Sequence, residues 1–265
     1  VVASFNEVRM TPRDADGQML LSHQLQVWPR ASVQAYVDYW GALVQSFDVQ
    51  DEHDMLEIVA SSLVDVPQWS PPPPGLDWSR LRDSSVLDRW GEYLVPTALV
   101  DDPRTDADRG PLVDQLGKLP SPALAVRGAI EAVRDRIRYD DAATGVTTTA
   151  AQAWEVGAGV CQDYSHTLLS LLRGLGIPAR YVSGYLHDEE EQPGRTVVGE
   201  SHAWVEVWNG GWEAHDPTND RRVGSAHVVV ARGRDYDDVP PLKGIYAGGL
   251  SESLGVTVEI TQLQG

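Results

Sequence analysis

In the stretch Gly157-Ala158-Gly159-Val160-Cys161-Gln162-Asp163-Tyr164, a glycine-rich turn leads into an amphipathic helix, and Cys161 is the only cysteine among 265 residues. Apolar residues then recur at helical spacing as far as Gly174-Leu175-Gly176, with Pro178 just beyond, so we expect a buried helix that begins at the cysteine. A thiol at a helix N-terminus lies near unpaired backbone N–H groups and the positive end of the helix dipole, which favour the thiolate form. This placement indicates a nucleophile.

Two later segments carry side chains that can activate such a thiol. His202 opens an alternating strand in Ser201-His202-Ala203-Trp204, and Asp216 closes the next strand in His215-Asp216-Pro217-Thr218-Asn219. Cysteine, histidine and aspartate in this order are the parts of an activated-thiol acyl-transfer site. Taken singly, each has a plainer role, because a cysteine is often a small buried apolar residue, a strand histidine a satisfied polar group and an aspartate before proline a turn starter.

The segment between these two strands, Asn209-Gly210-Gly211, is a hairpin signal that allows two registers. With a two-residue loop, Trp208 pairs with the last glycine, and His202 and Asp216 then point to opposite faces of the sheet. With a three-residue loop, Trp208 pairs with Trp212, and His202 becomes a same-face diagonal neighbour of Asp216. A catalytic role for these residues therefore predicts the three-residue loop or a compensating bulge.

Composition limits the classes of protein that the chain can belong to. An apolar content of 42% in 29.0 kDa is ordinary for a packed globular protein, and a single cysteine, which cannot form an intrachain disulfide, predicts a cytoplasmic location. The net charge of −18 repels nucleic acid and anionic lipid, so neither is an expected partner. The apolar runs are far shorter than the roughly 18 residues that a membrane span needs.

We expect residues 1–70 to form an N-terminal antiparallel β domain. Residues 5–10 and 20–28 flank a turn rich in Pro, Asp and Gly and predict a hairpin, and further strands are expected at 42–49 and 55–66. The run of four prolines at 71–74 cannot continue a helix or a central strand, so it predicts a domain boundary.

We expect a linker with short helices at residues 71–120 and an α+β core at 121–265. The linker contains a predicted helix near 87–94 and a polar loop at 101–110. In the core, Ser121-Pro122 predicts the start of a helix that runs to about Arg138. Strands follow at 180–186 and from about Thr196 through His202. The acidic loop between them, residues 188–194, is interpreted as a solvated hairpin tip rather than a calcium site, because it lacks spaced ligands.

These segments together resemble one family. The chain resembles the bacterial transglutaminase-like superfamily of cysteine enzymes in three segments: residues 159–186, Ser201-His202-Ala203-Trp204 and Asp216-Pro217-Thr218-Asn219. Gly233-Arg234-Asp235-Tyr236-Asp237-Asp238-Val239-Pro240-Pro241 resembles its C-terminal signature, and Ser4-Phe5-Asn6-Glu7-Val8-Arg9 resembles the N-terminal β domain of this branch. Members usually begin with one further strand. We therefore expect that this chain, which starts at Val1 without a visible signal peptide, lacks its original N-terminus.

The resemblance implies an N-terminal antiparallel β domain followed by a papain-like or transglutaminase-like core, in which the nucleophile helix packs on an antiparallel sheet. It implies that Cys161 is the nucleophile, His202 the general base and acid, and Asp216 the residue that orients and charges the imidazole. The backbone N–H of Cys161 is a natural oxyanion donor, and candidates for the second donor are Gln152, Trp154 and Gln162. Candidate substrate-binding residues are Tyr164, Trp204 and Asn219, although aromatic residues at such positions more often belong to the core.

The expected activity is hydrolysis of peptide or isopeptide amide bonds through a thioester, with a protein or peptide as substrate. Alternatives are a protein-glutamine transglutaminase, which passes the acyl group to an amine, and a catalytically silent binding module. His202 follows Cys161 by 41 residues, which fits neither the spacing of papain-like proteases nor the residue order of caspases. No cofactor or metal is expected, because His23, His53, His187, His215 and His227 form no metal-ligand spacing. Substrate identity and oligomeric state stay open.

Overall fold

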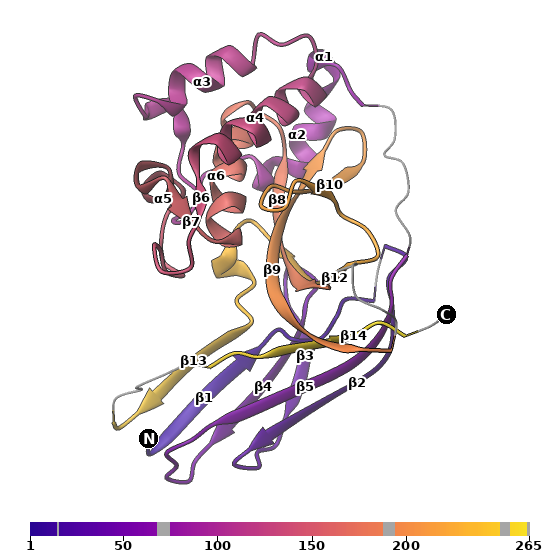
Figure 1. Cartoon of the computed structure of the whole chain (residues 1–265), viewed down its shortest axis with the longest axis vertical. Coiled ribbons are helices and arrows are strands. Elements are labelled where there is room, and N and C mark those ends of the chain that lie inside the picture. Colours follow the sequence, from indigo (N-terminus) through magenta and orange to yellow (C-terminus); the bar gives the residue numbers. More distant parts are fainter. Residues whose placement is uncertain (15, 68–74, 188–193, 250–254, 264–265) are drawn as a thin grey trace.

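The computed structural model describes residues 1–14, 16–67, 75–187, 194–249 and 255–263, and it has a helix-rich part and a β-rich part (Figure 1). The helices are α1 (Trp78–Leu81), α2 (Ser84–Trp90), η1 (Gly91–Tyr93), η2 (Pro103–Thr105), α3 (Arg109–Leu116), α4 (Pro122–Arg136), α5 (Ala150–Val156), α6 (Cys161–Gly174) and η3 (Tyr236–Asp238). The predicted α+β architecture with an N-terminal β region is confirmed.

The sheet beside the helices has the strand order β11-β10-β9-β8-β12, and every neighbouring pair is antiparallel. Its members are β8 (Ala179–Leu186), β9 (Thr196–Trp208), β10 (Trp212–Asp216), β11 (Arg221–Arg222) and β12 (His227–Gly233). Strand β14 (Val258–Thr261) pairs with the beginning of β9. Two short strands, β6 (Arg138–Tyr139) and β7 (Ala158–Gly159), form a parallel pair just before α6.

Helix α6 packs against β8 and β9 and is the centre of the larger hydrophobic core. Four of its leucines are fully buried, and burial of each such side chain stabilises the fold by about 1.5–3 kcal/mol. The same core contains Leu81 of α1 and Val113 of α3. Residues 75–120 are therefore part of the core rather than a linker, because their apolar side chains pack on the same helices and sheet.

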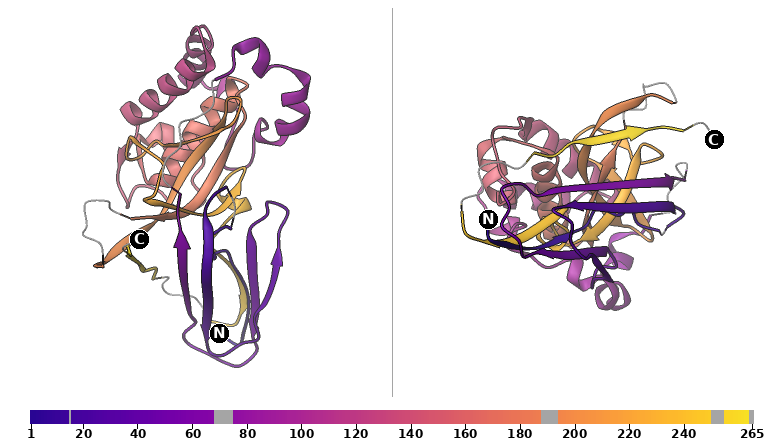
Figure 2. Two further views of the ribbon diagram at one scale, coloured as in Figure 1. Left: turned by 90° about the vertical axis from the view of Figure 1, so that its right-hand side faces the viewer. Right: turned by 90° about the horizontal axis from the view of Figure 1, so that it is seen from below.

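The N-terminal part is a small β sandwich that projects away from the helices (Figure 2). One layer has the order β13-β1-β4-β3 and the other is the pair β2-β5. The strands are β1 (Ala3–Val8), β2 (Met19–Trp28), β3 (Gln34–Val37), β4 (Leu43–Val49), β5 (Glu57–Asp65) and β13 (Leu242–Ala247). Val8, Phe47 and Val49 form its buried core.

The predicted hairpin of residues 5–10 with 20–28 is wrong. Strand β1 pairs with β4 and β13, whereas β2 pairs with β5, so the turn after β1 joins the two layers of the sandwich. The predicted end of the catalytic core also differs, because β13 completes the N-terminal sheet, with Ala3 opposite Ala247. The first and last parts of the chain thus build one layer together.

Other expectations are confirmed. Strands are present at 43–49 and 57–65, the helix predicted from Ser121 spans Pro122–Arg136, and a strand covers Ala179–Leu186. The polar loop predicted at 101–110 instead contains η2 and the start of α3. The proline run at 71–74 and most of the acidic loop, residues 188–193, lie outside the described residues. No helix in the described part of the chain combines the length and apolar character that crossing a bilayer requires.

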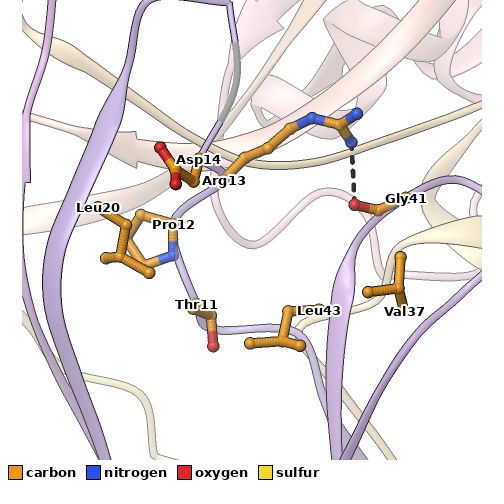
Figure 3. Close-up of a pocket in the computed structure, with 8 residues that line it drawn as sticks. All are labelled: Thr11, Pro12, Arg13, Asp14, Leu20, Val37, Gly41 and Leu43. Carbon is orange, nitrogen blue, oxygen red and sulfur yellow. Dashed lines mark hydrogen bonds between the residues drawn. The ribbon is translucent and has the colours of Figure 1, made fainter.

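The two parts meet where Arg13 and Gln18 lie against β12. The backbone N–H of Val229 donates to Gln18 Oε1 at 2.9 Å, and its carbonyl accepts from Arg13 N and from Gln18 Nε2, both at 2.8 Å. Next to this junction is a hollow of about 180 Å³, where Arg13 donates to the Gly41 carbonyl (Figure 3). One main-chain bond and two bonds from the Gln18 side chain to the Val229 backbone therefore fix the position of β12 against the N-terminal part.

Candidate active site

Helix α6 begins at Cys161, as the sequence predicts. Val160 is the N-cap in an extended conformation, and Asp163 Oδ2 accepts from the Val160 N–H at 2.8 Å and from Thr144 Oγ1 at 2.6 Å. Burial raises the pKa of Asp163, although these donors oppose the shift. A side chain at Gly159 would place its Cβ 2.5 Å from Asp163 Oδ2, so only glycine leaves room for this cap. The thiol of Cys161 is half-buried at the first helical position.

The β9–β10 hairpin has the three-residue loop. Trp208 pairs with Trp212, and Gly210 takes the left-handed conformation with φ of 92°. This is the register in which His202 and Asp216 share a face of the sheet. The expectation drawn from turn geometry is confirmed.

His202 and Asp216 form a buried pair. His202 Nε2 lies 2.9 Å from Asp216 Oδ2, and the two side chains are 2% and 0% exposed. The other carboxylate oxygen, Oδ1, accepts the backbone N–H groups of Thr218 at 3.1 Å and Asn219 at 3.2 Å. The turn after β10 thus holds the carboxylate in one orientation.

The Cys161 thiol lies close enough to the His202 ring to raise the pKa of that ring. Because Nε2 is engaged by Asp216, the nitrogen left for the sulfur is Nδ1. The structure thus brings His202 and Asp216 into contact, and Cys161 is near enough to influence the His202 ring.

The environment shifts the pKa values of the pair in opposite directions. Burial lowers the pKa of His202, but the hydrogen bonds and charges of Asp216 and Cys161 outweigh burial and raise it to about 9. Burial would raise the pKa of Asp216, yet hydrogen bonds from His202, His227 and Asn219 hold it far below its usual value. At neutral pH the pair is therefore an imidazolium next to a carboxylate.

Two further side chains contact Asp216. Asn219 Nδ2 donates to Oδ2 at 3.0 Å, and His227 Nε2 lies 3.3 Å from the same oxygen. The sequence gives Asn219 as a candidate for substrate binding and does not single out His227. A histidine at the start of an apolar strand carries no local signal of this contact, because β12 and β10 are not neighbours in the sheet.

His202, Asp216 and His227 offer one ligand atom each, and these atoms lie within 4.8 Å of one another, which is close enough for a metal ion. Hydrogen bonds from both rings to one carboxylate oxygen explain this proximity without a metal.

The three candidate substrate-binding residues differ in exposure. Tyr164 is 5% exposed and donates its hydroxyl to the Ile137 carbonyl, which places it in the core. Trp204 is fully buried with its ring beside that of His202, at a centroid distance of 6.1 Å. Asn219 alone is exposed. Direct contact with a substrate stays a prediction, and Asn219 is the only one of the three that is open to solvent.

The candidates for a second oxyanion donor also differ. Gln162 Nε2 donates to the Val146 carbonyl at 2.9 Å, and Gln152 Oε1 caps α5 by accepting from Thr149 N at 2.9 Å. Trp154 Nε1 is buried and has no hydrogen-bond partner among the described residues. No triad residue lines the hollow of Figure 3, so that hollow is separate from this site.

A helix that begins at a cysteine and packs on an antiparallel sheet carrying a His–Asp pair is the core architecture of the transglutaminase-like class of folds. The sequence profile of the transglutaminase-like superfamily matches residues 111–217, and that of the bacterial transglutaminase-like N-terminal region matches residues 1–65. The chain belongs to the transglutaminase-like superfamily and carries the N-terminal region of its bacterial branch.

Relatives agree with this assignment. An uncharacterized protein of Mycobacterium leprae is 40% identical over 262 residues, covering 98% of this chain and 93% of that protein. A protein-glutamine gamma-glutamyltransferase of Pseudomonas aeruginosa is 30% identical over 152 residues, which is 52% of this chain and 21% of that protein. The crystal structure of a candidate cysteine protease from Cytophaga hutchinsonii has the same fold, with a TM-score of 0.77, 20% identity and coverage of 98% of this chain and 86% of that chain.

Proposed function

We propose that the protein is a thiol-dependent acyl-transfer enzyme that hydrolyses peptide or isopeptide amide bonds through a Cys161-His202-Asp216 triad. The observation that carries the proposal is the buried His202–Asp216 pair, with Nε2 2.9 Å from Oδ2, and the Cys161 thiol near enough to raise the pKa of the same ring. An imidazole whose pKa is raised to about 9 retains its proton at neutral pH, which stabilises a neighbouring thiolate.

In the proposed reaction the Cys161 thiolate attacks the amide carbonyl carbon and forms a C–S bond. His202 gives its proton to the leaving nitrogen as the C–N bond breaks, which leaves a thioester and a free amine. Water then attacks the thioester and gives a proton to His202, the C–S bond breaks, and the carboxylic acid leaves. Asp216 stays ionised throughout and stabilises the imidazolium.

The developing oxyanion needs hydrogen-bond donors that are in place before the reaction. The Cys161 backbone N–H belongs to the first turn of α6, where helical N–H groups lack intrahelical partners. The Trp154 indole, buried and without a partner among the described residues, is our candidate for the second donor. Gln162 has less support, because its Nε2 already donates to the Val146 carbonyl, and the Gln152 side chain is held on α5 by its Oε1, which accepts from Thr149 N.

Transfer to an amine is the second candidate function. It is favoured by the 30% identity over 152 residues to the gamma-glutamyltransferase of Pseudomonas aeruginosa. The two reactions share the thioester and differ only in the acceptor that resolves it. We give priority to hydrolysis because cross-linkers of the eukaryotic type resemble this chain only in the core and use calcium, for which the sequence shows no ligand pattern.

A labelling experiment separates an enzyme from a silent binding module. We expect iodoacetamide at pH 5.5 to label Cys161 rapidly in the native protein and slowly in His202→Ala, as measured by mass spectrometry over time. Labelling of the native protein no faster than that of the urea-unfolded chain would favour the silent module. The single cysteine makes the signal unambiguous.

A second experiment separates hydrolysis from transfer. Dimethylcasein serves as a general protein substrate, and monodansylcadaverine as an amine acceptor. Hydrolysis releases ammonia or new N-termini whether or not the amine is present. Incorporation of the dansyl group in place of those products would instead assign the protein to the transferases.

A further inference from the structure

His227 is a second buried histidine on the triad carboxylate. It is the first residue of β12, its side chain is 0% exposed, and its Nε2 lies 3.3 Å from Asp216 Oδ2. The same oxygen binds His202 Nε2 at 2.9 Å. Two imidazole rings from different strands thus converge on one oxygen atom.

The hydrogen bonds of His227 specify which ring nitrogen carries the proton. Gly224 N–H points to His227 Nδ1 at 3.4 Å, so Nδ1 is an acceptor and the proton of a neutral ring lies on Nε2. That proton faces Asp216. The Trp204 ring stands edge-on to the His227 ring, at a centroid distance of 5.2 Å and an angle of 79°, and helps to keep water out.

Strand β12, which contains His227, is hydrogen-bonded to the N-terminal part of the chain. Two residues further along β12, Val229 bonds through both its N–H and its carbonyl to Gln18, and its carbonyl also accepts from Arg13. The N-terminal part of the chain therefore fixes the end of β12 from which His227 reaches the carboxylate. These bonds fix the backbone of β12 close to His227.

We propose that His227 is a positioning residue for the triad. Its Nε2–H donates to Asp216 and holds the carboxylate in place, so that the carboxylate keeps the His202 imidazolium beside Cys161. His227 acts through Asp216 and does not contact the sulfur. The inference rests on the proposed function, since it assumes that the His202–Cys161 pair does chemistry.

The test measures the rate of iodoacetamide labelling of Cys161 between pH 4 and pH 9. We expect His227→Leu, which removes the donor, to shift the acidic limb of the profile upward by about one pH unit. At a fixed pH on the acidic limb, this shift makes the labelling of Cys161 about tenfold slower in His227→Leu than in the native protein. His227→Gln should restore the native profile, because its amide nitrogen reaches the position of Nε2, whereas a role in packing alone would not be rescued in this way.

His187→Leu is the matched control. His187 is also buried, at 7% exposure, and makes no described contact with Asp216, so its loss should leave the profile unchanged. A native profile in His227→Leu would overturn the inference while leaving the proposed function intact. Slow labelling of the native protein would instead remove the proposed function itself.

A measurement on the native chain covers the case in which His227→Leu does not fold. In ¹⁵N spectra of histidine-labelled protein at pH 8, His227 should show the tautomer protonated at Nε2, with its proton shifted downfield by the carboxylate. Assignment is made from the spectrum of His227→Gln. The tautomer protonated at Nδ1 would contradict the inference, because its Nε2 cannot donate to Asp216.

Discussion

Gly184 lies directly opposite His202 across the paired strands β8 and β9. A Cβ at Gly184 would overlap the Val228 carbonyl oxygen and lie 2.6 Å from the Trp204 ring. Trp204 in turn packs beside the rings of His202 and His227. The missing side chain at Gly184 therefore gives the triad histidine and its neighbours the space that they occupy.

We expect Gly184→Ala to destabilise the protein by about 1–3 kcal/mol, because the added methyl group must displace β12 or the tryptophan. The rate of Cys161 labelling at pH 5.5 should fall in the fraction that remains folded. Gly145→Ala is the control, since a Cβ there meets no atom within 4 Å. Equal urea midpoints for the two variants would show that the sheet tolerates the methyl group.

Glu206 is the anion of a buried ion network on the same sheet. Its Oε2 accepts from Arg180 Nε at 2.6 Å and from Arg232 Nε at 2.8 Å. Burial alone would raise the pKa of Glu206, but the charges of the two arginines hold it below its usual value. We expect Glu206→Gln to cost about 3–5 kcal/mol in urea unfolding, because two largely buried cations lose the anion that they share and Arg232 keeps only the exposed Asp16.

The control for this prediction is the exposed pair of Arg104 and Asp102, in which the arginine side chain is 64% exposed. Arg104→Gln should change the free energy of unfolding by less than about 1 kcal/mol. If the two substitutions cost the same, the buried network does not contribute to stability in the way described.

Local patterns predicted where Cys161, His202 and Asp216 lie in the fold, because the segment around each residue has a local signal. The glycine turn before Cys161 and the apolar spacing after it predicted the helix start, and the Asn209-Gly210-Gly211 loop decided the register of His202 and Asp216. In a hairpin, the loop length alone determines which residues face one another. Turn chemistry was therefore sufficient to place two residues of the site on one face.

The parts that escaped prediction depend on contacts between distant segments. Strand β13 joins β1 across almost the whole chain, and no feature of residues 242–247 indicates which sheet edge they complete. The expected linker at residues 71–120 is wrong, because Leu81 and Val113 pack in the same core as the helices and sheet that follow. His227 contacts Asp216 although β12 pairs with β8 and is not a neighbour of β10, so no pairing pattern in the sequence indicates this contact.

Cys161→Ala tests the nucleophile. We expect turnover of dimethylcasein to fall by at least about 10³-fold, because no other group can form the thioester. The free energy of unfolding should stay within about 1 kcal/mol of the native value, since the thiol is half-buried and Ala is a good helix former. A large loss of stability with residual turnover would make Cys161 a packing residue instead.

The pH dependence of turnover tests the charge on His202. Burial lowers the pKa of this ring and its contacts with Asp216 and Cys161 raise it, to about 9 in sum. Protonation of the leaving amine requires the imidazolium, so kcat/KM should stay high at pH 7–8 and fall as pH rises through about 9. The same upward shift stabilises the fold below the unfolded pKa of roughly 6.5, and this stability is lost as pH rises through the folded value. In Asp216→Asn the alkaline limb of the kcat/KM profile should move toward neutral pH, because the carboxylate that holds the proton is gone. An alkaline limb that stays near pH 9 in this variant would mean that Asp216 does not charge the imidazole.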